Sequence, residues 1–164
     1  AVLLAALPGD FPLNIELKRG ATDRGRLAEL ALAATAERDN VLFSSFDADL
    51  LWELRRRAPS AWIAPLASRR TPAIERLAAE LEAWSLHLSA AEFELAEDGA
   101  PAAGSRKGLP LLAYTVNDAA RARALLAAGA AGLFTDRPGA LRAELGELGD
   151  SGVLSRTYRG SSAP

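Results

Sequence analysis

The sequence predicts an α/β fold in which parallel strands alternate with helices. Short β-rich runs and longer Ala-, Leu- and Arg-rich runs alternate through most of the 164 residues, giving about six strand–helix units. A second observation is chemical, because polar or aromatic residues stand at the carboxyl ends of the expected strands. They are Glu16, Lys18, Phe46, His87, Tyr114 and Asp136. Ligands gather at that end both in a doubly wound sheet and in a (β/α)₈ barrel, so the pattern leaves both folds open.

Strands are expected where apolar residues run together, and helices where leucines and alanines recur every three or four residues. We expect strands at 13–17, 41–46, 61–66, 84–88, 109–116 and 130–135. We expect helices at about 23–38, after residue 47, at 71–83, up to residue 128, and from 138 to about 148. In the first of these helices, Leu27, Leu30 and Ala34 are predicted to form a buried stripe.

Residues that favour helix ends support these boundaries. Asp47 and Thr71 stand where N-caps are expected. Asn117 or Asp118 is expected to cap the helix that follows the strand at 109–116, and Gly129 stands where that helix should end.

Some segments carry little pattern. The run from 89 to 108 is expected to hold a short helix near 91–96 and then a loop, because Gly and Pro interrupt it. The polar residues 149–164 are expected to form a loose tail beyond one domain of residues 1–148. The Arg55–Arg57 run is interpreted as a solvated helix face.

The composition excludes several classes of protein. A net charge of −2 gives no broad basic surface for nucleic acid, and no apolar run reaches the roughly 18 residues of a membrane-spanning helix. The absence of cysteine rules out disulfides and thiolate metal sites and fits a reducing compartment. The sequence contains no methionine, not even at position 1, so we expect a processed product or a fragment.

The strand at 13–17 ends with an acid and a base on one face. Its apolar residues alternate with polar ones, so Glu16 and Lys18 project to the same side. A carboxylate at a strand end can bind a hard cation such as Mg²⁺ or Ca²⁺, and an ammonium group beside it can hold a phosphate oxygen. The alternative is a structural ion pair between Glu16 and either Lys18 or Arg19.

Five motifs resemble those of the glycerophosphodiester phosphodiesterase family. They are LNIELK, VLFSSFDADLLWELRRRAP, SLHLS, AYTVND and AAGLFTDRPGAL. They follow the family's order up to about residue 145, and the pairing of SLHL with YTVN is most similar to the bacterial cytoplasmic members. The resemblance implies a (β/α)₈ TIM barrel, a cytoplasmic protein, and hydrolysis of glycerophosphodiesters to glycerol 3-phosphate and an alcohol with a divalent cation.

The resemblance also implies roles for single residues. It makes Glu16 a metal ligand, Lys18 a phosphate contact and His87 a substrate contact. Tyr114 and Phe46 would form walls of the pocket, although ordinary packing explains both equally well. The resemblance assigns no catalytic acid–base residue to this chain.

The family's His-Arg-Gly and Glu-x-Asp motifs do not occur in the sequence, and His87 is its one histidine. The resemblance therefore implies an incomplete barrel of about six units that lacks the first two, and with them the acid–base histidines and two of three carboxylate ligands. We expect this chain alone to be inactive. Two alternatives stay open: a different phosphate-binding barrel enzyme, and a truncated binding or structural module without catalysis.

Overall fold

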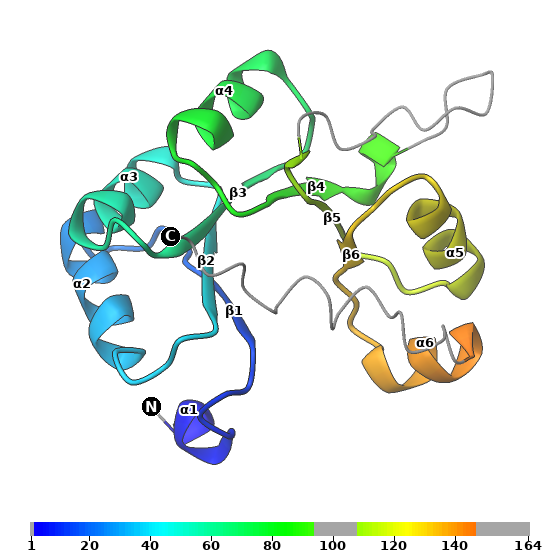
Figure 1. Ribbon diagram of the computed structural model, residues 1–164, viewed down its shortest axis with the longest axis horizontal. Coiled ribbons are helices and arrows are strands. Elements are labelled where there is room, and N and C mark those ends of the chain that lie inside the picture. Colours follow the sequence, from blue (N-terminus) through cyan, green and yellow to red (C-terminus); the bar gives the residue numbers. More distant parts are fainter. Residues whose placement is uncertain (1, 94–107, 147–164) are drawn as a thin grey trace. The chain divides into compact units, whose positions relative to one another are not determined.

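A computed structural model describes residues 2–93 and 108–146 of the protein, and Figure 1 shows its helices and strands. They divide between two units. The first unit runs to Leu66 and includes Thr71–Trp84, and the second contains Ala67–Arg70 and the residues from Ser85 onward. In each unit the strands are parallel and lie in chain order.

The first unit brings the carboxyl ends of two strands side by side. Its elements are α1 (Val2–Ala6), β1 (Leu13–Glu16), α2 (Arg24–Ala34), β2 (Val41–Ser45), α3 (Ala48–Arg57), β3 (Trp62–Ala67) and α4 (Pro72–Glu80). Glu16 at the end of β1 lies opposite Ser44 of β2, and Ser44 lies opposite Ala64 of β3. The residues that follow β1 and β2 therefore emerge at one edge of this sheet.

The second unit repeats the arrangement. Its elements are β4 (Leu86–Ser89), the 3₁₀ helix η1 (Ala90–Phe93), β5 (Leu111–Tyr114), α5 (Ala119–Ala127), β6 (Gly132–Leu133) and α6 (Pro138–Leu145). Leu86 lies opposite Leu111, and Leu112 lies opposite Gly132.

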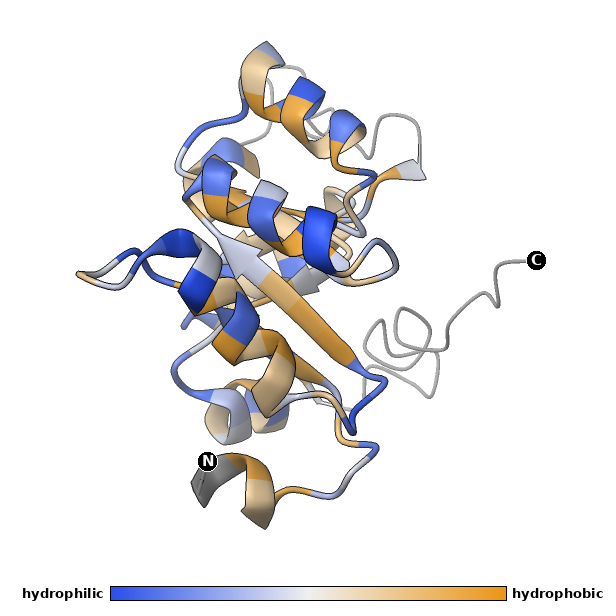
Figure 2. Ribbon diagram, turned by 90° about the vertical axis from the view of Figure 1, so that its left-hand side faces the viewer, coloured by the Kyte–Doolittle hydropathy of each residue, from blue (hydrophilic) through white to orange (hydrophobic). Residues whose placement is uncertain are grey.

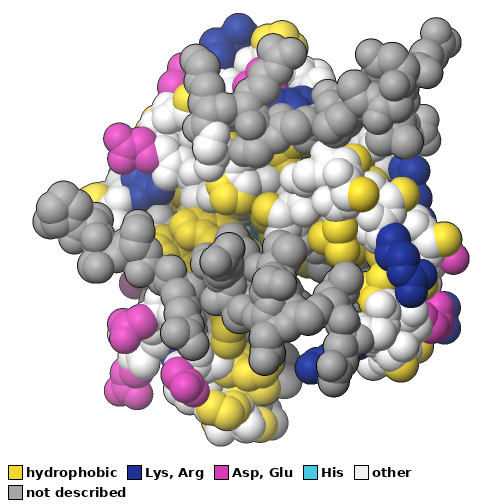
Figure 3. Space-filling model, turned by 45° about the vertical axis from the view of Figure 1, so that its right-hand side comes forward, with side chains coloured by type: hydrophobic (Ala, Val, Ile, Leu, Met, Phe, Trp, Pro, Cys, Tyr) yellow, Lys and Arg dark blue, Asp and Glu magenta, His cyan; other side chains and the backbone are white. Residues whose placement is uncertain are grey.

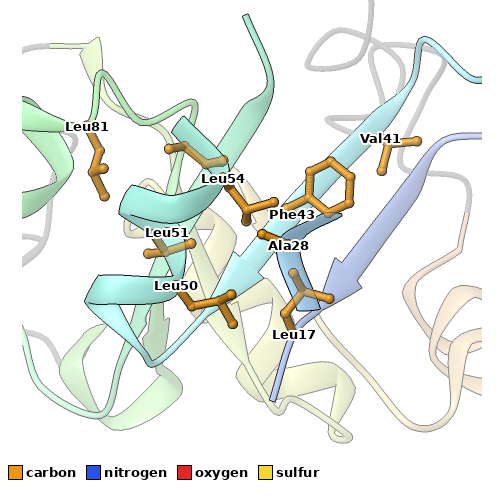
Figure 4. Close-up of a cluster of buried hydrophobic side chains, with 9 residues drawn as sticks. Leu17, Ala28, Val41, Phe43, Leu50, Leu51, Leu54 and Leu81 are labelled. Carbon is orange, nitrogen blue, oxygen red and sulfur yellow. The ribbon is translucent and has the colours of Figure 1, made fainter. Parts of the chain in front are cut away.

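The hydrophobic core of the first unit lies between the strands and their helices. Leu50, Leu51 and Leu54 of α3 are fully buried and pack in one cluster with Leu17 and Phe43 (Figure 4). Figure 2 shows the same division along the chain, because hydrophobic residues gather on strands and on one side of the helices. Burial of each leucine contributes about 1.5–3 kcal/mol to the free energy of folding, so this face of α3 is a main source of the stability of the first unit.

The buried face of α2 differs from the predicted stripe. Leu30 is 46% exposed and Ala34 is also exposed, whereas Gly25 and Ala28 are buried. The reason is the close approach of α3, since a Cβ atom at Gly25 would lie 2.7 Å from the guanidinium of Arg57. Small residues face α3 here, so the predicted stripe is wrong for Leu30 and Ala34.

Several helix caps are confirmed. Asp47, Thr71 and Asp118 each accept a hydrogen bond from the backbone N–H three residues ahead, at 3.2, 3.3 and 2.7 Å. Gly129 follows α5 with a φ of 93°, the left-handed conformation that glycine adopts without strain.

Other boundaries are shorter than predicted. α2 ends at Ala34 rather than near residue 38, because the hydroxyl of Thr35 turns back to a carbonyl of the last turn at 3.0 Å. The short helix expected at 91–96 is the 3₁₀ helix η1, and β6 has two residues. The rest of the helix expected at 91–96, the loop expected after it up to residue 107, and the tail predicted at 149–164 lie outside the described residues.

Arg55 corrects the interpretation of the Arg55–Arg57 run as a solvated face. Its Nε donates to the carbonyl of Leu81 just after α4, at 3.0 Å, and burial lowers the pKa of this guanidinium. Arg56 and Arg57, with side chains 65% and 43% exposed, pair with Glu53 at the surface as expected.

Within the described residues, no helix combines the length and the apolar composition that crossing a bilayer requires. On the face drawn in Figure 3, acidic and basic side chains both reach the surface, with hydrophobic side chains between them.

Replacing Leu54 with alanine should lower the free energy of unfolding by about 2–5 kcal/mol, because a fully buried side chain leaves a cavity. Replacing the half-exposed Leu30 with alanine should change it by less than about 0.5 kcal/mol. Urea denaturation followed by tryptophan fluorescence measures both values. Equal losses for the two variants would contradict this assignment of the core.

Candidate functional site

A hollow of about 590 Å³ opens in the first unit where β1 and β2 end. Its volume is in the range of small-molecule sites. Its walls come from the carboxyl ends of the two strands and from the beginnings of α2 and α3. The lining residues are Glu16, Leu17, Lys18, Arg19, Arg24, Ser45, Phe46, Asp47 and Ala48. The structure thus brings three predicted site residues, Glu16, Lys18 and Phe46, together around one hollow.

Glu16 and Lys18 form a loose ion pair at the edge of this hollow. The Nζ atom of Lys18 lies 3.7 Å from Oε2 of Glu16, and the side chains are 78% and 33% exposed, respectively. An ion pair this long and this accessible to water contributes little to stability. A ligand can therefore separate the two groups at small cost, which weakens the alternative of a purely structural pair.

Asp47 and Arg24 form a tighter pair at the rim. The Nε–H of Arg24 is shared between the two carboxylate oxygens of Asp47, at 2.9 and 3.0 Å, and Asp47 also caps α3. Burial alone raises the pKa of Asp47, but the hydrogen bonds from Arg24 and from the backbone of Leu50 outweigh it and hold the pKa below its ordinary value. The pair joins the beginnings of α2 and α3.

Phe46 gives the hollow an apolar wall. Its side chain is 56% exposed although it follows a fully buried strand. An aromatic side chain this accessible is not part of the core, so core packing does not account for its position. Large exposed aromatic side chains beside polar groups are typical of ligand sites.

His87 and Tyr114 lie in the second unit. His87 of β4 is opposite Leu112 and Tyr114 of β5 is opposite Ser89, so the side chains of His87 and Tyr114 project from the same face. Their proposed roles as substrate contacts stay predictions.

His87 is fully buried between Leu86 and Leu88 of β4. Its Nε2 lies 3.0 Å from the hydroxyl oxygen of Ser85, and its ring centroid lies 4.8 Å from that of Phe134. Burial lowers the pKa of His87 to about 4, so its imidazole is neutral at pH 7. The ring can exchange hydrogen bonds there, but it carries no charge.

Asn117 links the ends of two strands in the second unit and does not cap α5. Its Oδ1 accepts hydrogen bonds from the hydroxyl of Thr135 and the N–H of Asp136, both at 2.9 Å. Its Nδ2 donates to the Asp136 carboxylate at 2.9 Å. The turn after β6 is thus held by side-chain hydrogen bonds.

One carboxylate in the hollow is suited to a cation. Within the part of the chain that the structure describes, no three His, Asp or Glu side chains are grouped to hold a metal ion. Asp47 is committed to Arg24, whereas among the described residues the oxygens of Glu16 have only the loose contact with Lys18. A hard cation takes six or more oxygen ligands, so Glu16 fits one position of such a shell and the others must come from other groups or water.

No sequence pattern singles out Arg24 or Ser45 as a site residue, and the pattern around Asp47 predicts only a helix cap. Arg24 carried no local signal, because its partner Asp47 lies 23 residues away. Ser45 offered one signal, since it occupies the last position of a buried strand, directly before exposed Phe46.

Comparison with known proteins points to one family. The model of the glycerophosphoryl diester phosphodiesterase family matches residues 14–140, which is most of the chain. No curated protein matches the chain.

Solved structures share the fold. A phosphodiesterase from Oleispira antarctica, in complex with the product sn-glycerol-3-phosphate, is 23% identical with a TM-score of 0.69 over 80% of this chain and 54% of that one. A protein assigned as a glycerophosphoryl diester phosphodiesterase from Silicibacter pomeroyi is 26% identical with a TM-score of 0.66, over 82% and 50%. A glycerophosphodiester phosphodiesterase from Parabacteroides distasonis is 20% identical with a TM-score of 0.64, over 82% and 57%.

This chain spans about half the length of these solved structures. The similarity confirms the predicted fold, an incomplete (β/α)₈ barrel, and decides against the doubly wound sheet.

Replacing Asp47 with alanine should lower the free energy of unfolding by about 1–2 kcal/mol, because α3 loses its N-cap. Replacing Asp49, whose side chain is 74% exposed, with alanine should cost less than about 0.5 kcal/mol. Thermal and urea denaturation measure both. The structural role of Asp47 would be refuted by equal effects.

His87 should make the protein less stable in mild acid. Its pKa is about 4 in the folded state and about 6.5 when unfolded, so between these values the unfolded chain binds the extra proton. The stabilisation is complete above pH 6.5 and declines as the pH falls toward 4, by up to about 3 kcal/mol.

Urea denaturation between pH 7 and 4.5 measures this slope. Because the sequence has no second histidine, His87→Gln should remove the slope. An unchanged slope in that variant would show that His87 is accessible or charged in the folded state.

Proposed function

The chain belongs to the glycerophosphoryl diester phosphodiesterase family, and from this premise we propose that it is the substrate-binding part of an enzyme that hydrolyses glycerophosphodiesters. The products would be glycerol 3-phosphate and an alcohol. The observation that carries the proposal is the loose Glu16–Lys18 pair at the edge of the hollow, where a carboxylate and an ammonium group are both accessible. The neighbour from Oleispira antarctica, which holds sn-glycerol-3-phosphate, supports a small phosphate ester as ligand.

Glu16 is the proposed ligand for a divalent cation, Mg²⁺ or Ca²⁺. Its carboxylate offers the hard oxygen atoms that these ions prefer, and it is one-third exposed at a strand end. A bound cation would polarise the phosphate and stabilise the charge that develops on it. The contribution of Glu16 would be to hold the cation at a fixed place beside Lys18.

Lys18 is the proposed contact for a phosphate oxygen. The Lys18 side chain is more exposed than that of Glu16, and its ammonium group acts as a mobile point charge. On binding, the 3.7 Å contact between Lys18 and Glu16 would give way to a shorter contact between Lys18 and a phosphate oxygen. Phe46 supplies an apolar wall in the same hollow.

Tyr114 and His87 are the proposed contacts from the second unit. They share one face of β4 and β5. His87 is neutral near pH 7 and is therefore suited to hydrogen bonding rather than to proton transfer. We assign no acid–base residue to this chain, and we propose that the chain alone does not turn over substrate. We propose the cytoplasm as its compartment, and a sequence without cysteine fits such a reducing environment.

The first test compares Glu16→Ala with Glu29→Ala in the protein expressed from the complete reading frame that contains this chain. Glu29 lies on α2 and its side chain is 61% exposed, so it is a matched control. With glycerophosphocholine and Mg²⁺ or Ca²⁺, Glu16→Ala should lower kcat/KM by at least about 100-fold and weaken the activating metal. Glu29→Ala should leave both unchanged.

Full activity of Glu16→Ala would overturn the metal assignment. If the unaltered protein failed to cleave any glycerophosphodiester, the proposed function would be wrong. The chain would then belong to an enzyme that acts on a different phosphate ester, or to a module without catalysis. Metal-dependent turnover by this chain alone would show that its own residues suffice for catalysis.

A further inference from the structure

The backbone of Leu17 is held to β2 from both sides. Its N–H donates to the carbonyl of Ser44 at 2.8 Å, and its carbonyl accepts from the hydroxyl of Ser45 at 2.7 Å. Its side chain is only 7% exposed and packs in the core of the first unit. Leu17 stands between Glu16 and Lys18, so the direction of both side chains depends on how this one residue is fixed.

The hydroxyl of Ser45 makes two hydrogen bonds and has no access to solvent. It donates to the carbonyl of Leu17 and accepts from the N–H of Asp47 at 3.0 Å. The residue is 1% exposed, so no water replaces these partners from the surface. We call these two hydrogen bonds the strand-end link, because they join the end of β1 to the turn between β2 and α3.

The strand-end link acts most directly on Lys18. The carbonyl that Ser45 holds belongs to the peptide group between Leu17 and Lys18, and a planar peptide moves as one body. Fixing that carbonyl therefore fixes the backbone of Lys18. The peptide group before Leu17 is held instead by the carbonyl of Ser44, which does not depend on a side chain.

We propose that Ser45 is a positioning residue, whose buried hydroxyl orients Lys18 toward a bound phosphate while Glu16 is held mainly by the sheet. The proposal deepens the proposed function and rests on it for the identity of the ligand. Asp47 supports the same link from the other side, since Arg24 and α3 fix the turn whose N–H bonds to Ser45. Ser45 itself does not touch the ligand.

The chain offers a matched control in Ser44. It is also a fully buried serine, in the same strand, but its hydroxyl oxygen has no hydrogen-bond partner among the described residues. Loss of the hydroxyl at position 44 should therefore leave the strand end unchanged. Ser45→Thr keeps a hydroxyl at position 45 and tests whether that group, rather than the size of the side chain, is responsible.

Two measurements test the proposal. In the protein from the complete reading frame, with Mg²⁺ saturating, calorimetry measures the Kd of sn-glycerol 3-phosphate. Ser45→Ala should raise this Kd roughly three- to tenfold, because the hydrogen bond that orders the backbone of Lys18 is lost. The Kd of Mg²⁺ alone should change less than about twofold. Ser44→Ala should leave both constants unchanged, and Ser45→Thr should restore phosphate binding.

The second measurement needs no ligand. Amide hydrogen exchange by NMR on this chain should show the Asp47 amide, which loses its acceptor, exchanging roughly tenfold faster in Ser45→Ala than in the unaltered chain. The Leu17 amide, which donates to the backbone carbonyl of Ser44, should stay unchanged. Unchanged exchange at Asp47, or equal weakening of phosphate and Mg²⁺ binding, would overturn the role of Ser45. If the unaltered protein does not bind sn-glycerol 3-phosphate, the proposed function fails, and the exchange rate alone decides whether the link fixes the strand end.

Discussion

The burial of Leu17 in the core of the first unit sets the direction of the groups around the hollow. Side chains alternate along an extended backbone, so a residue fixed inward requires its neighbours to project to the other side. Glu16 and Lys18 are those neighbours, and they meet at 3.7 Å at the edge of the hollow. Hydrophobic burial of Leu17 thus fixes the positions of Glu16 and Lys18, although an ion pair between these two groups in water would contribute little free energy.

Charge at this edge is divided between a tight pair and a loose one. Arg24 and Asp47 hold each other at 2.9 Å, and the cap that Asp47 forms on α3 adds to that arrangement. Glu16 and Lys18 stay accessible beside them. The tight pair keeps the rim in place without using Glu16 and Lys18, the two groups that we propose bind the ligand. A rigid frame around a weakly paired acid and base is suited to binding a metal phosphate.

Features that depend on local sequence were predicted better than features that depend on contacts between residues far apart in the chain. The two-residue period placed Glu16 and Lys18 on one face because strand geometry alone decides that. The Arg24–Asp47 pair spans 23 residues, so no local pattern contains it. The same holds for Leu30, where the close approach of α3 overrode the hydrophobic spacing. Recognition of family motifs supplied the barrel, which counting strands could not distinguish from an open sheet.

A crystal structure of the protein from the complete reading frame, soaked with Mg²⁺ and sn-glycerol 3-phosphate, would show whether Glu16 and Lys18 form a site for a metal ion and a phosphate ester. We expect a carboxylate oxygen of Glu16 within about 2.0–2.6 Å of the cation, as hard cations require. We also expect Lys18 to leave Glu16 and to contact a phosphate oxygen. A cation bound away from Glu16, with the Glu16–Lys18 pair intact beside the bound phosphate ester, would contradict the proposed roles of both residues.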